Sequence, residues 1–255
     1  MTRSSRPSGT TKRPVAPEPS RRSPMVIITV AAAALGLLAV AVLAVAGGLP
    51  GGSSPSALAT PIVQSPTALE DGRSLGAADA PITIDVWADF QCPVCARFSR
   101  DIEPAIVSRY VEPGLVRLTY RDFSFIGPES FDAAVAARVA VAQGASFWAY
   151  HDLLFANQGA ENQGAFSRDR LGDMAVAVGL DRQPFLAALD DPAMLAAVHE
   201  ETAVGQSLGV DSTPTMSIDG QLAAGLPDWT RLSAYLDGLV AVASSAPTGP
   251  GTSAP

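Results

Sequence analysis

Residues 80–98 read APITIDVWADFQCPVCARF, and this stretch decides the fold. Its first half alternates apolar and polar residues, with Ile82 and Ile84 on one face, which is the pattern of a β-strand. A helical pattern begins at the two cysteines, where Pro93 suits the first turn of a helix. The stretch therefore predicts a strand over residues 80–90 that leads directly into a helix, with both sulfurs at the junction.

The segments that follow extend this pattern into an α/β chain. The helix that starts at the cysteines contains Pro104, which predicts a kink or a break, and residues 115–123 alternate as a second strand. Residues 128–208 are Ala-rich and helical in period. Strand character returns at residues 213–225, and a last amphipathic helix covers residues 228–243. The predicted fold is a sheet covered by helices, with a helical insertion between its two halves.

The remaining chain divides into segments by composition. Residues 1–24 carry six Lys or Arg against one Glu and almost no apolar side chain, which predicts a disordered tail. Residues 25–49 contain no charge and are long enough, at about 1.5 Å per residue, to cross a bilayer core as a transmembrane helix. Residues 50–68 are rich in Gly, Pro and Ser, which predicts a flexible linker. Residues 244–255 have the same character and predict a disordered tail.

Charges around the apolar run predict its orientation. Arg21 and Arg22 directly precede it, and the next charged residue is Glu70. The positive-inside rule then predicts a cytoplasmic N-terminus and an extracytoplasmic domain over residues 69–243. A cleaved secretory signal is the alternative, because residues 57–59, ALA, have the small-residue pattern of a cleavage site. We prefer an uncleaved membrane anchor, because the apolar run is longer than that of a signal peptide.

The distribution of charged residues also indicates which kinds of partner the domain could bind. Of the 17 basic and 25 acidic residues, 11 basic and 24 acidic ones lie beyond residue 24. An excess of acidic residues argues against nucleic acid or an anionic surface as partner, and for a soluble acidic domain.

Cys92 and Cys95 are the only cysteines, and three interpretations of the pair compete. A structural disulfide across about four residues would stabilise the fold by only about 2 kcal/mol. A zinc site needs more ligands than two thiolates, and neither His151, which we expect in an aromatic core, nor His199 lies at a recognised spacing. A redox couple is favoured, because the start of a helix offers unpaired N–H groups and a positive dipole end that stabilise a thiolate. Such a couple needs no cofactor.

These residues, followed by GVDSTPTMSIDG at 209–220, resemble the DsbA-like thiol:disulfide oxidoreductases of the thioredoxin superfamily. The stretch FWAYHDLLFANQ at 147–158 is similar to the helical domain that such proteins insert into the thioredoxin fold. The resemblance covers about residues 77–240. It implies a thioredoxin fold with an inserted helical domain, and an enzyme that forms disulfide bonds in exported proteins.

The resemblance assigns roles to the CPVC motif. Cys92 would be the exposed nucleophile and Cys95 the buried resolving thiol. Pro93 and Val94 would form the dipeptide by which the family tunes the stability of the thiolate. Val94 stands where the best-known oxidase has His, so the dipeptide lacks one side chain that stabilises a thiolate.

The resemblance also assigns supporting residues. Pro214 would be a cis-proline that faces the cysteines and exposes the Thr213 backbone to an extended substrate, with the Thr213 hydroxyl near the Cys92 sulfur. In thioredoxins, a buried acid on the strand before the cysteines accepts the proton of the resolving thiol. That role would fall to Asp85, with Asp89 as a second and more exposed candidate.

The partners implied by the resemblance are exported proteins with cysteine thiols and a membrane quinone-linked oxidase that reoxidises the pair. Two alternatives stay open. A disulfide reductase or isomerase of the same fold would be kept reduced by a transmembrane electron donor. A metal-binding or non-catalytic binding module would use the fold without the chemistry. The direction of electron flow separates the first alternative from an oxidase.

Overall fold

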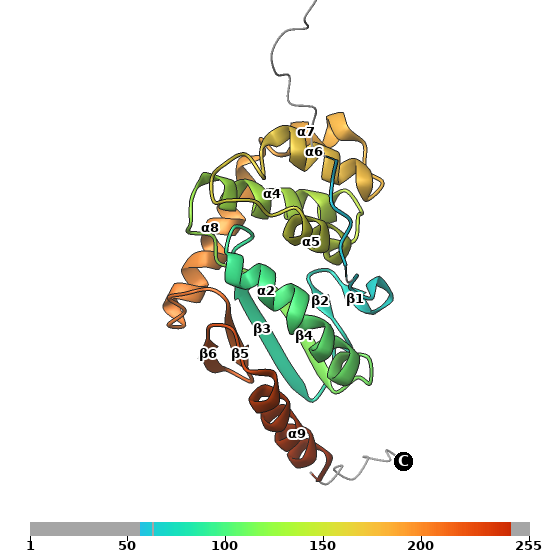
Figure 1. The fold of residues 1–255 in the computed structure, drawn as a ribbon, viewed down its shortest axis with the longest axis vertical. Coiled ribbons are helices and arrows are strands. Elements are labelled where there is room, and N and C mark those ends of the chain that lie inside the picture. The colour runs from blue at the N-terminus through green and yellow to red at the C-terminus, as the bar shows by residue number, and fades with distance from the viewer. Residues whose placement is uncertain (1–56, 63, 246–255) are drawn as a thin grey trace, which may run out of the picture. The chain divides into compact units, whose positions relative to one another are not determined.

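The computed structural model describes residues 57–62 and 64–245, whose arrangement Figure 1 shows. The predicted tail at residues 1–24 and the predicted anchor at residues 25–49 lie outside the described residues. The strands are β1 (Glu70–Asp71), β2 (Ser74–Leu75), β3 (Ile82–Ala88), β4 (Val116–Asp122), β5 (Thr215–Ile218) and β6 (Gln221–Ala224). The helices are α2 (Pro93–Asp101), α3 (Glu103–Ile106), α4 (Pro128–Ala142), α5 (Phe147–Ala156), α6 (Arg168–Ala177), α7 (Arg182–Ala188), α8 (Pro192–Ser207) and α9 (Trp229–Ser245), with a 3-10 turn η1 (Thr67–Leu69) and a π-helical turn η2 (Val107–Val111).

The six strands form one sheet in the order β1-β2-β4-β3-β5-β6. Strand β3 is parallel to β4, with Ile84 opposite Leu118, and antiparallel to β5, with Trp87 opposite Thr215. This pairing places the start of β5 beside the carboxyl end of β3, where the chain continues into α2. Two stretches were predicted from the sequence to form the reactive site, residues 90–95 and 213–214. They therefore meet at the carboxyl end of β3.

The predicted alternation along β3 is confirmed by burial. Ile82, Ile84 and Val86 belong to the main cluster of buried residues, which also contains residues of α2, α3 and α9. The opposite face carries Trp87. Its ring packs edge to face with the ring of Phe123, and the two ring centroids are 6.5 Å apart. Figure 1 shows α2 lying across β3 and β4, so the helix that begins at the cysteines packs on the centre of the sheet.

The helix after the cysteines breaks where Pro104 predicts it. Helix α2 ends at Asp101, Ile102 caps it, and α3 begins at Glu103 with Pro104 in its first turn. Proline has no backbone N–H and cannot continue the hydrogen bonding of the preceding helix. After the break, the chain continues as α3 and η2.

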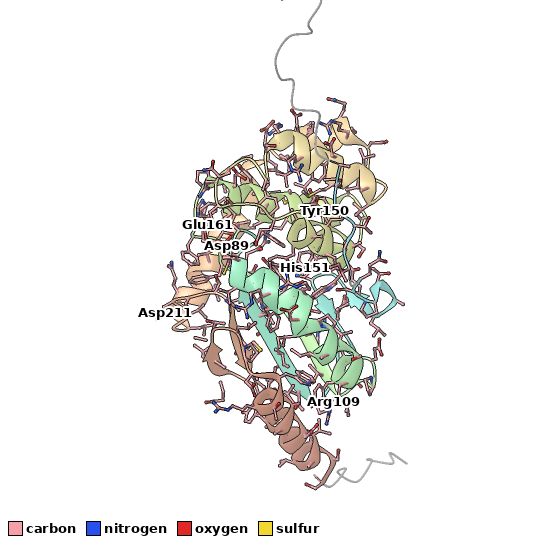
Figure 2. All side chains as sticks on the ribbon, in the orientation of Figure 1. Asp89, Arg109, Tyr150, His151, Glu161 and Asp211 are labelled. Atoms are coloured by element: carbon pink, nitrogen blue, oxygen red, sulfur yellow. The ribbon has the colours of Figure 1, made fainter. Side chains whose placement is uncertain are left out.

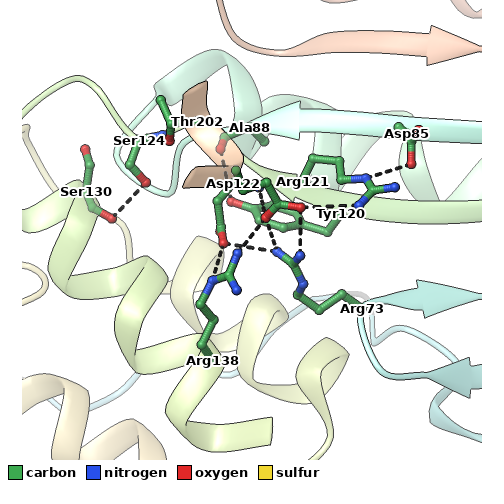
Figure 3. A network of polar contacts seen from close by, with 11 residues as sticks. Arg73, Asp85, Ala88, Tyr120, Arg121, Asp122, Ser124, Ser130, Arg138 and Thr202 are labelled. Carbon is green, nitrogen blue, oxygen red and sulfur yellow. Dashed lines mark hydrogen bonds and ion pairs between the residues drawn. The ribbon is translucent and has the colours of Figure 1, made fainter. Parts of the chain in front are cut away.

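Helices α4 to α8 form the predicted insertion between β4 and β5, and Figure 1 shows them beyond one end of the sheet. A network of ion pairs joins this insertion to the sheet (Figure 3). Asp122 at the end of β4 accepts from Arg73 at 3.0 Å and from Arg138 of α4 at 2.7 Å. Glu201 of α8 binds both of these arginines and also Arg121. The insertion is thus fixed to the sheet by paired charges that are largely buried.

Two features near the start of the domain were not predicted. Strands β1 and β2 pair as a short hairpin at the edge of the sheet. Ala59 and Ser65, which lie in the stretch that the composition assigned to a flexible linker, are hydrogen-bonded to α5 and its end. The Asn157 side chain binds both the N–H and the C=O of Ala59, at 2.8 and 2.9 Å, and Asp152 accepts from the Ser65 N–H at 2.6 Å. This part of the predicted linker is therefore joined to α5 by specific hydrogen bonds.

The hairpin and the last helix follow the sequence closely. Asp219 and Gly220 both have positive φ, 47° and 84°, as a tight turn between β5 and β6 requires. Helix α9 runs to Ser245, two residues beyond the predicted end of the domain. Within the described residues, none of the helices combines the length and the apolar character needed to cross a bilayer.

Candidate active site

The two cysteines lie at the first turn of α2. Cys92 is the N-cap residue, with an extended backbone, and Pro93 occupies the first helical position. The N–H groups of the first turn of a helix have no partner within the helix, and they carry the positive end of its dipole. The sulfur of Cys92 therefore lies beside backbone donors that favour a thiolate. The two cysteines are not joined by a disulfide.

The surroundings of the two thiols shift their pKa values in opposite directions. A hydrogen bond from the Cys95 thiol is the largest cause that lowers the pKa of Cys92 to about 6, against the effect of burial and with further help from Thr213 and from the N–H groups of Cys95 and Val94. Burial, above all, raises the pKa of Cys95 well above its ordinary value, and the hydrogen bond to Cys92 adds to this. The pair thus consists of one reactive and one protected thiol.

Cys92 is more exposed than Cys95, as predicted, but it is not the exposed residue that the resemblance implied. Cys95 is 1 % exposed and Cys92 is 6 % exposed, so the proposed nucleophile is itself largely buried. The dipeptide between them contributes through its backbone, because Val94 lowers the pKa of Cys92 with its N–H group. A side chain at this position is not what stabilises the thiolate here.

The loop before β5 closes the site from the other side. The Thr213–Pro214 peptide bond is cis, as the resemblance implied. When it is protonated, the Cys92 thiol donates to the Thr213 carbonyl oxygen, with a sulfur–oxygen distance of 3.4 Å. The Thr213 hydroxyl is buried and makes no hydrogen bond with the described residues, although its position lowers the pKa of both thiols. The two predicted halves of the site are thereby brought together.

Asp89 fixes the turn that leads into the cysteines, and Figure 2 shows it where β3 meets α2. It is fully buried rather than exposed as predicted, and its carboxylate accepts from the N–H groups of Gln91, Phe125 and Ile126 at 2.8, 3.0 and 3.2 Å. A carboxylate that satisfies three buried N–H groups holds the backbone of the turn in place. Its role is to shape the site.

Asp85 does not lie beneath the resolving thiol. It points away from the face that packs on α2 and forms an ion pair with Arg121 of the neighbouring strand, at 2.9 Å, with 31 % of its side chain exposed. The alternation of β3 places it on the face opposite to Ile84 and Val86, and that face is only partly covered at this point. The expectation that Asp85 accepts the proton of Cys95 is therefore not supported by its position.

A buried polar cluster lies farther along α5 and the α2–α3 break. His151, shown in Figure 2, packs among aromatic rings as expected, and its Nδ1 lies 2.9 Å from Asp152 while its Nε2 lies 4.0 Å from Glu103. Burial raises the pKa of Glu103 to about 7. The donor atoms of Glu103, His151 and Asp152 lie within 4.8 Å of one another, the one such group among the described residues that could hold a metal ion. No cysteine takes part in it.

Polar side chains of the insertion reach the cysteine turn, and the sequence analysis assigned none of them a role in the site. Gln158, just after α5, donates from Nε2 to the carbonyl oxygens of Phe90 and Cys92 at 2.7 and 3.0 Å. Gln91, in the same turn, is held by Ser130 of α4 and by Asn162. Long-range contacts of this kind leave no local signal in a sequence.

Comparisons with known proteins agree with this geometry. A family model described as Thioredoxin matches residues 68–238. Disulfide bond formation protein D of Bacillus subtilis is 27 % identical over 165 residues, which are 64 % of this chain and 74 % of that protein.

Solved structures share the fold. The oxidised form of BdbD from Bacillus subtilis superposes with a TM-score of 0.62 at 24 % identity, covering 67 % of this chain and 93 % of that one. DsbA of Chlamydia trachomatis gives a TM-score of 0.60 at 19 % identity, covering 72 % and 98 %. At these identities the likeness concerns the fold.

Proposed function

Since this chain belongs to the thioredoxin family and is a DsbA-like thiol:disulfide oxidoreductase, we propose that it forms disulfide bonds in exported proteins from a membrane anchor. The Bacillus subtilis relative is named for disulfide bond formation, which supports the direction of the reaction. The CPVC pair is the proposed reactive group, and no cofactor takes part.

The reaction exchanges one disulfide for another. A client thiolate attacks the Cys92 sulfur of the oxidised pair, the Cys92–Cys95 bond breaks, and Cys95 leaves as a thiolate that takes up a proton. A second client thiolate then attacks the client sulfur of the mixed disulfide, and Cys92 leaves as a thiolate. Two electrons pass from the client thiols to the cysteine pair, and the client gains one disulfide.

One observation carries the oxidase direction: the reduced pair is stabilised by its own surroundings. The Cys95 hydrogen bond and the helix N–H groups hold the pKa of Cys92 at about 6, so Cys92 is a thiolate at neutral pH. A stable thiolate is a good leaving group in the second step, and stabilisation of the reduced form makes the disulfide a stronger oxidant. This stabilisation comes from the backbone and from Cys95, although the motif carries Val94.

The cis-proline loop is the proposed docking edge for the client. Thr213 has its carbonyl oxygen 3.4 Å from the Cys92 sulfur, so a client cysteine that reacts with Cys92 passes directly beside this loop. An extended client segment that pairs with the backbone at Thr213 would bind through main-chain groups and would accept many sequences. That breadth suits an enzyme with many exported clients.

Anchoring and reoxidation complete the proposal. The uncharged run at residues 25–49, preceded by Arg21 and Arg22, supports a single-pass anchor with the catalytic domain outside the cytoplasm. The pair must lose two electrons after each cycle, and we propose a membrane quinone-linked oxidase as the acceptor. Protease protection in sealed cells tests the topology, because the catalytic domain should be digested from outside.

Trapping experiments test the chemistry. In the Cys95→Ser variant the pair cannot form its own disulfide, so mixed disulfides should arise when the Cys92 thiolate attacks a client disulfide and displaces one client thiolate. They should accumulate because no Cys95 thiol is present to attack the Cys92 sulfur and release the client, and they should disappear on reduction. Cys92→Ser should form none and should have no exchange activity. Absence of mixed disulfides in the Cys95→Ser variant, at normal protein levels, would argue against the proposed function.

The reduction potential of the full chain decides between oxidase and reductase. Equilibration with glutathione buffers should give a value near about −120 to −180 mV if the reduced form is stabilised. A value of about −250 mV or lower would instead favour the reductase alternative with a membrane electron donor.

A further inference from the structure

Gln158 is the one side chain of the helical insertion that binds the backbone of the cysteine turn at two points. Its Nε2 donates to Phe90 O at 2.7 Å and to Cys92 O at 3.0 Å, so both amide hydrogens are used. The two carbonyls flank Gln91 in the turn that Asp89 closes through the Cys92 N–H at 3.0 Å. The side-chain amide of Gln158 therefore links the Phe90 and Cys92 carbonyl oxygens on either side of Gln91.

We propose that Gln158 is a positioning residue for the nucleophilic thiol, acting by holding the Phe90 and Cys92 carbonyls so that the Cys92 sulfur stays at the N-terminus of α2. This role rests on the proposed function of Cys92. It assigns to the helical insertion a direct part in the chemistry of the pair.

Two physical effects follow from the contact. A carbonyl oxygen carries partial negative charge, and one that lies close to a thiolate destabilises it unless a donor offsets that charge. Gln158 supplies a donor to the carbonyl of Cys92 itself, which otherwise accepts only the first hydrogen bond of α2, from the Ala96 N–H at 3.1 Å. The amide also limits rotation of the turn, so the sulfur keeps its alignment with the N–H groups of Val94 and Cys95.

Asn157, the residue before Gln158, binds the N-terminal segment of the domain. Its side-chain amide binds the N–H and C=O of Ala59. Adjacent amides thus hold the N-terminal segment on one side and the cysteine turn on the other. The end of α5 is therefore a fixed point, and it gives Gln158 a rigid base from which to position the turn.

Substitutions at Gln158 test the role through the ionisation of Cys92. In the full chain, we expect Gln158→Ala to raise the pKa of Cys92 by about half a unit to one unit and to lower the equilibrium constant for oxidation of glutathione by about threefold to tenfold. Gln158→Glu should have a larger effect in the same direction, because a carboxylate cannot donate and adds negative charge near the thiolate. The rate of iodoacetamide alkylation against pH measures the pKa, since Cys95 stays protonated in this range.

Gln143→Ala is the matched control. Gln143 also donates from Nε2 to a backbone carbonyl of the insertion, Pro184 O at 3.2 Å, but at an exposed site away from the cysteines. It should leave the pKa of Cys92 and the glutathione equilibrium unchanged. If the Gln158 variants change only the thermal midpoint and titrate as the parent does, the positioning role is wrong. Loss of exchange activity in the parent chain would instead overturn the proposed function, so the two failures are distinct.

Discussion

At the scale of single residues, the site depends on two sulfurs that lie one helical turn apart in different surroundings. Cys92 receives a hydrogen bond from the Cys95 thiol, and this donation is the largest cause of its low pKa. Cys95 is 1 % exposed, and burial, above all, keeps it protonated. Each thiol thus sets the state of the other, so a change at Cys95 should alter Cys92 even before any exchange occurs.

Substitutions at Cys95 should therefore move the titration of Cys92. We expect Cys95→Ala to raise the pKa of Cys92 from about 6 toward the ordinary value of 9.0, because the main donor is lost. Cys95→Ser keeps a hydroxyl donor and should raise it less. Alkylation rates between about pH 4 and 10 give both values. Two variants that still titrate near pH 6 would show that the helix N–H groups alone set the pKa.

The same shift makes the stability of the reduced protein depend on pH. The pKa of Cys92 is lower in the folded chain than the ordinary value of 9.0, so its thiolate contributes stability that falls as pH drops through about 6. The oxidised protein has no thiols and lacks this term. We expect the thermal midpoint of the reduced form, relative to the oxidised form, to rise between pH 6 and pH 8. A constant difference across this range would contradict the low pKa.

The sequence identified the residues of the redox pair but not the carboxylates around it. The spacing of Cys92 and Cys95 and the strand before them are local features, and they predicted the reactive group. The position of Asp85 depended on whether a second layer covers that face of β3, and its partner Arg121 comes from another strand. The burial of Asp89 and Glu103 likewise depends on contacts with distant segments, which one sequence does not reveal.

At the scale of elements, helix α8 approaches the sheet closely at one residue. A Cβ at Gly205 would lie 2.8 Å from the rings of both Trp87 and Phe123. These rings, with Val210, form the small core on the sheet face opposite α2. Glycine is therefore required there by packing, and helix propensity alone would favour alanine.

We expect Gly205→Ala to destabilise the domain by about 1–3 kcal/mol, because the rings of Trp87 and Phe123 must move. Gly238→Ala in α9 is the matched control, since a Cβ there meets nothing within 4 Å. It should be neutral or stabilising by up to about 1 kcal/mol. Urea unfolding of both variants measures the difference. Equal free energies of unfolding for the two variants would show that α8 adjusts without cost.

The elements that could be predicted are those with several turns or alternations of pattern. Strands β3 and β4, the break at Pro104 and the helices of the insertion all carry such patterns. Strands β1 and β2 have two residues each, which is too short for a period to show. The docking of Ala59 and Ser65 on α5 was missed because polar backbone contacts are compatible with the composition of a linker.

At the scale of the whole domain, the position of the insertion relative to the sheet depends on paired charges. Glu201 of α8 accepts from Arg73, Arg121 and Arg138, which come from the β1–β2 turn, β4 and α4. Its side chain is only 11 % exposed. Loss of one member of a buried network leaves the others unpaired, and such a loss costs more than the network contributes as a whole.

Glu201→Gln should therefore destabilise the domain by about 3 kcal/mol, because three arginines lose their shared carboxylate. Asp190→Asn is the matched control: Asp190 pairs with Arg168 at 2.7 Å, but the two side chains are 72 % and 48 % exposed, so we expect a change within about 0.5 kcal/mol. Urea unfolding at neutral pH gives both values. If the two substitutions cost the same, apolar packing alone fixes the insertion, and Gln158 then reaches the cysteine turn without help from the charge network.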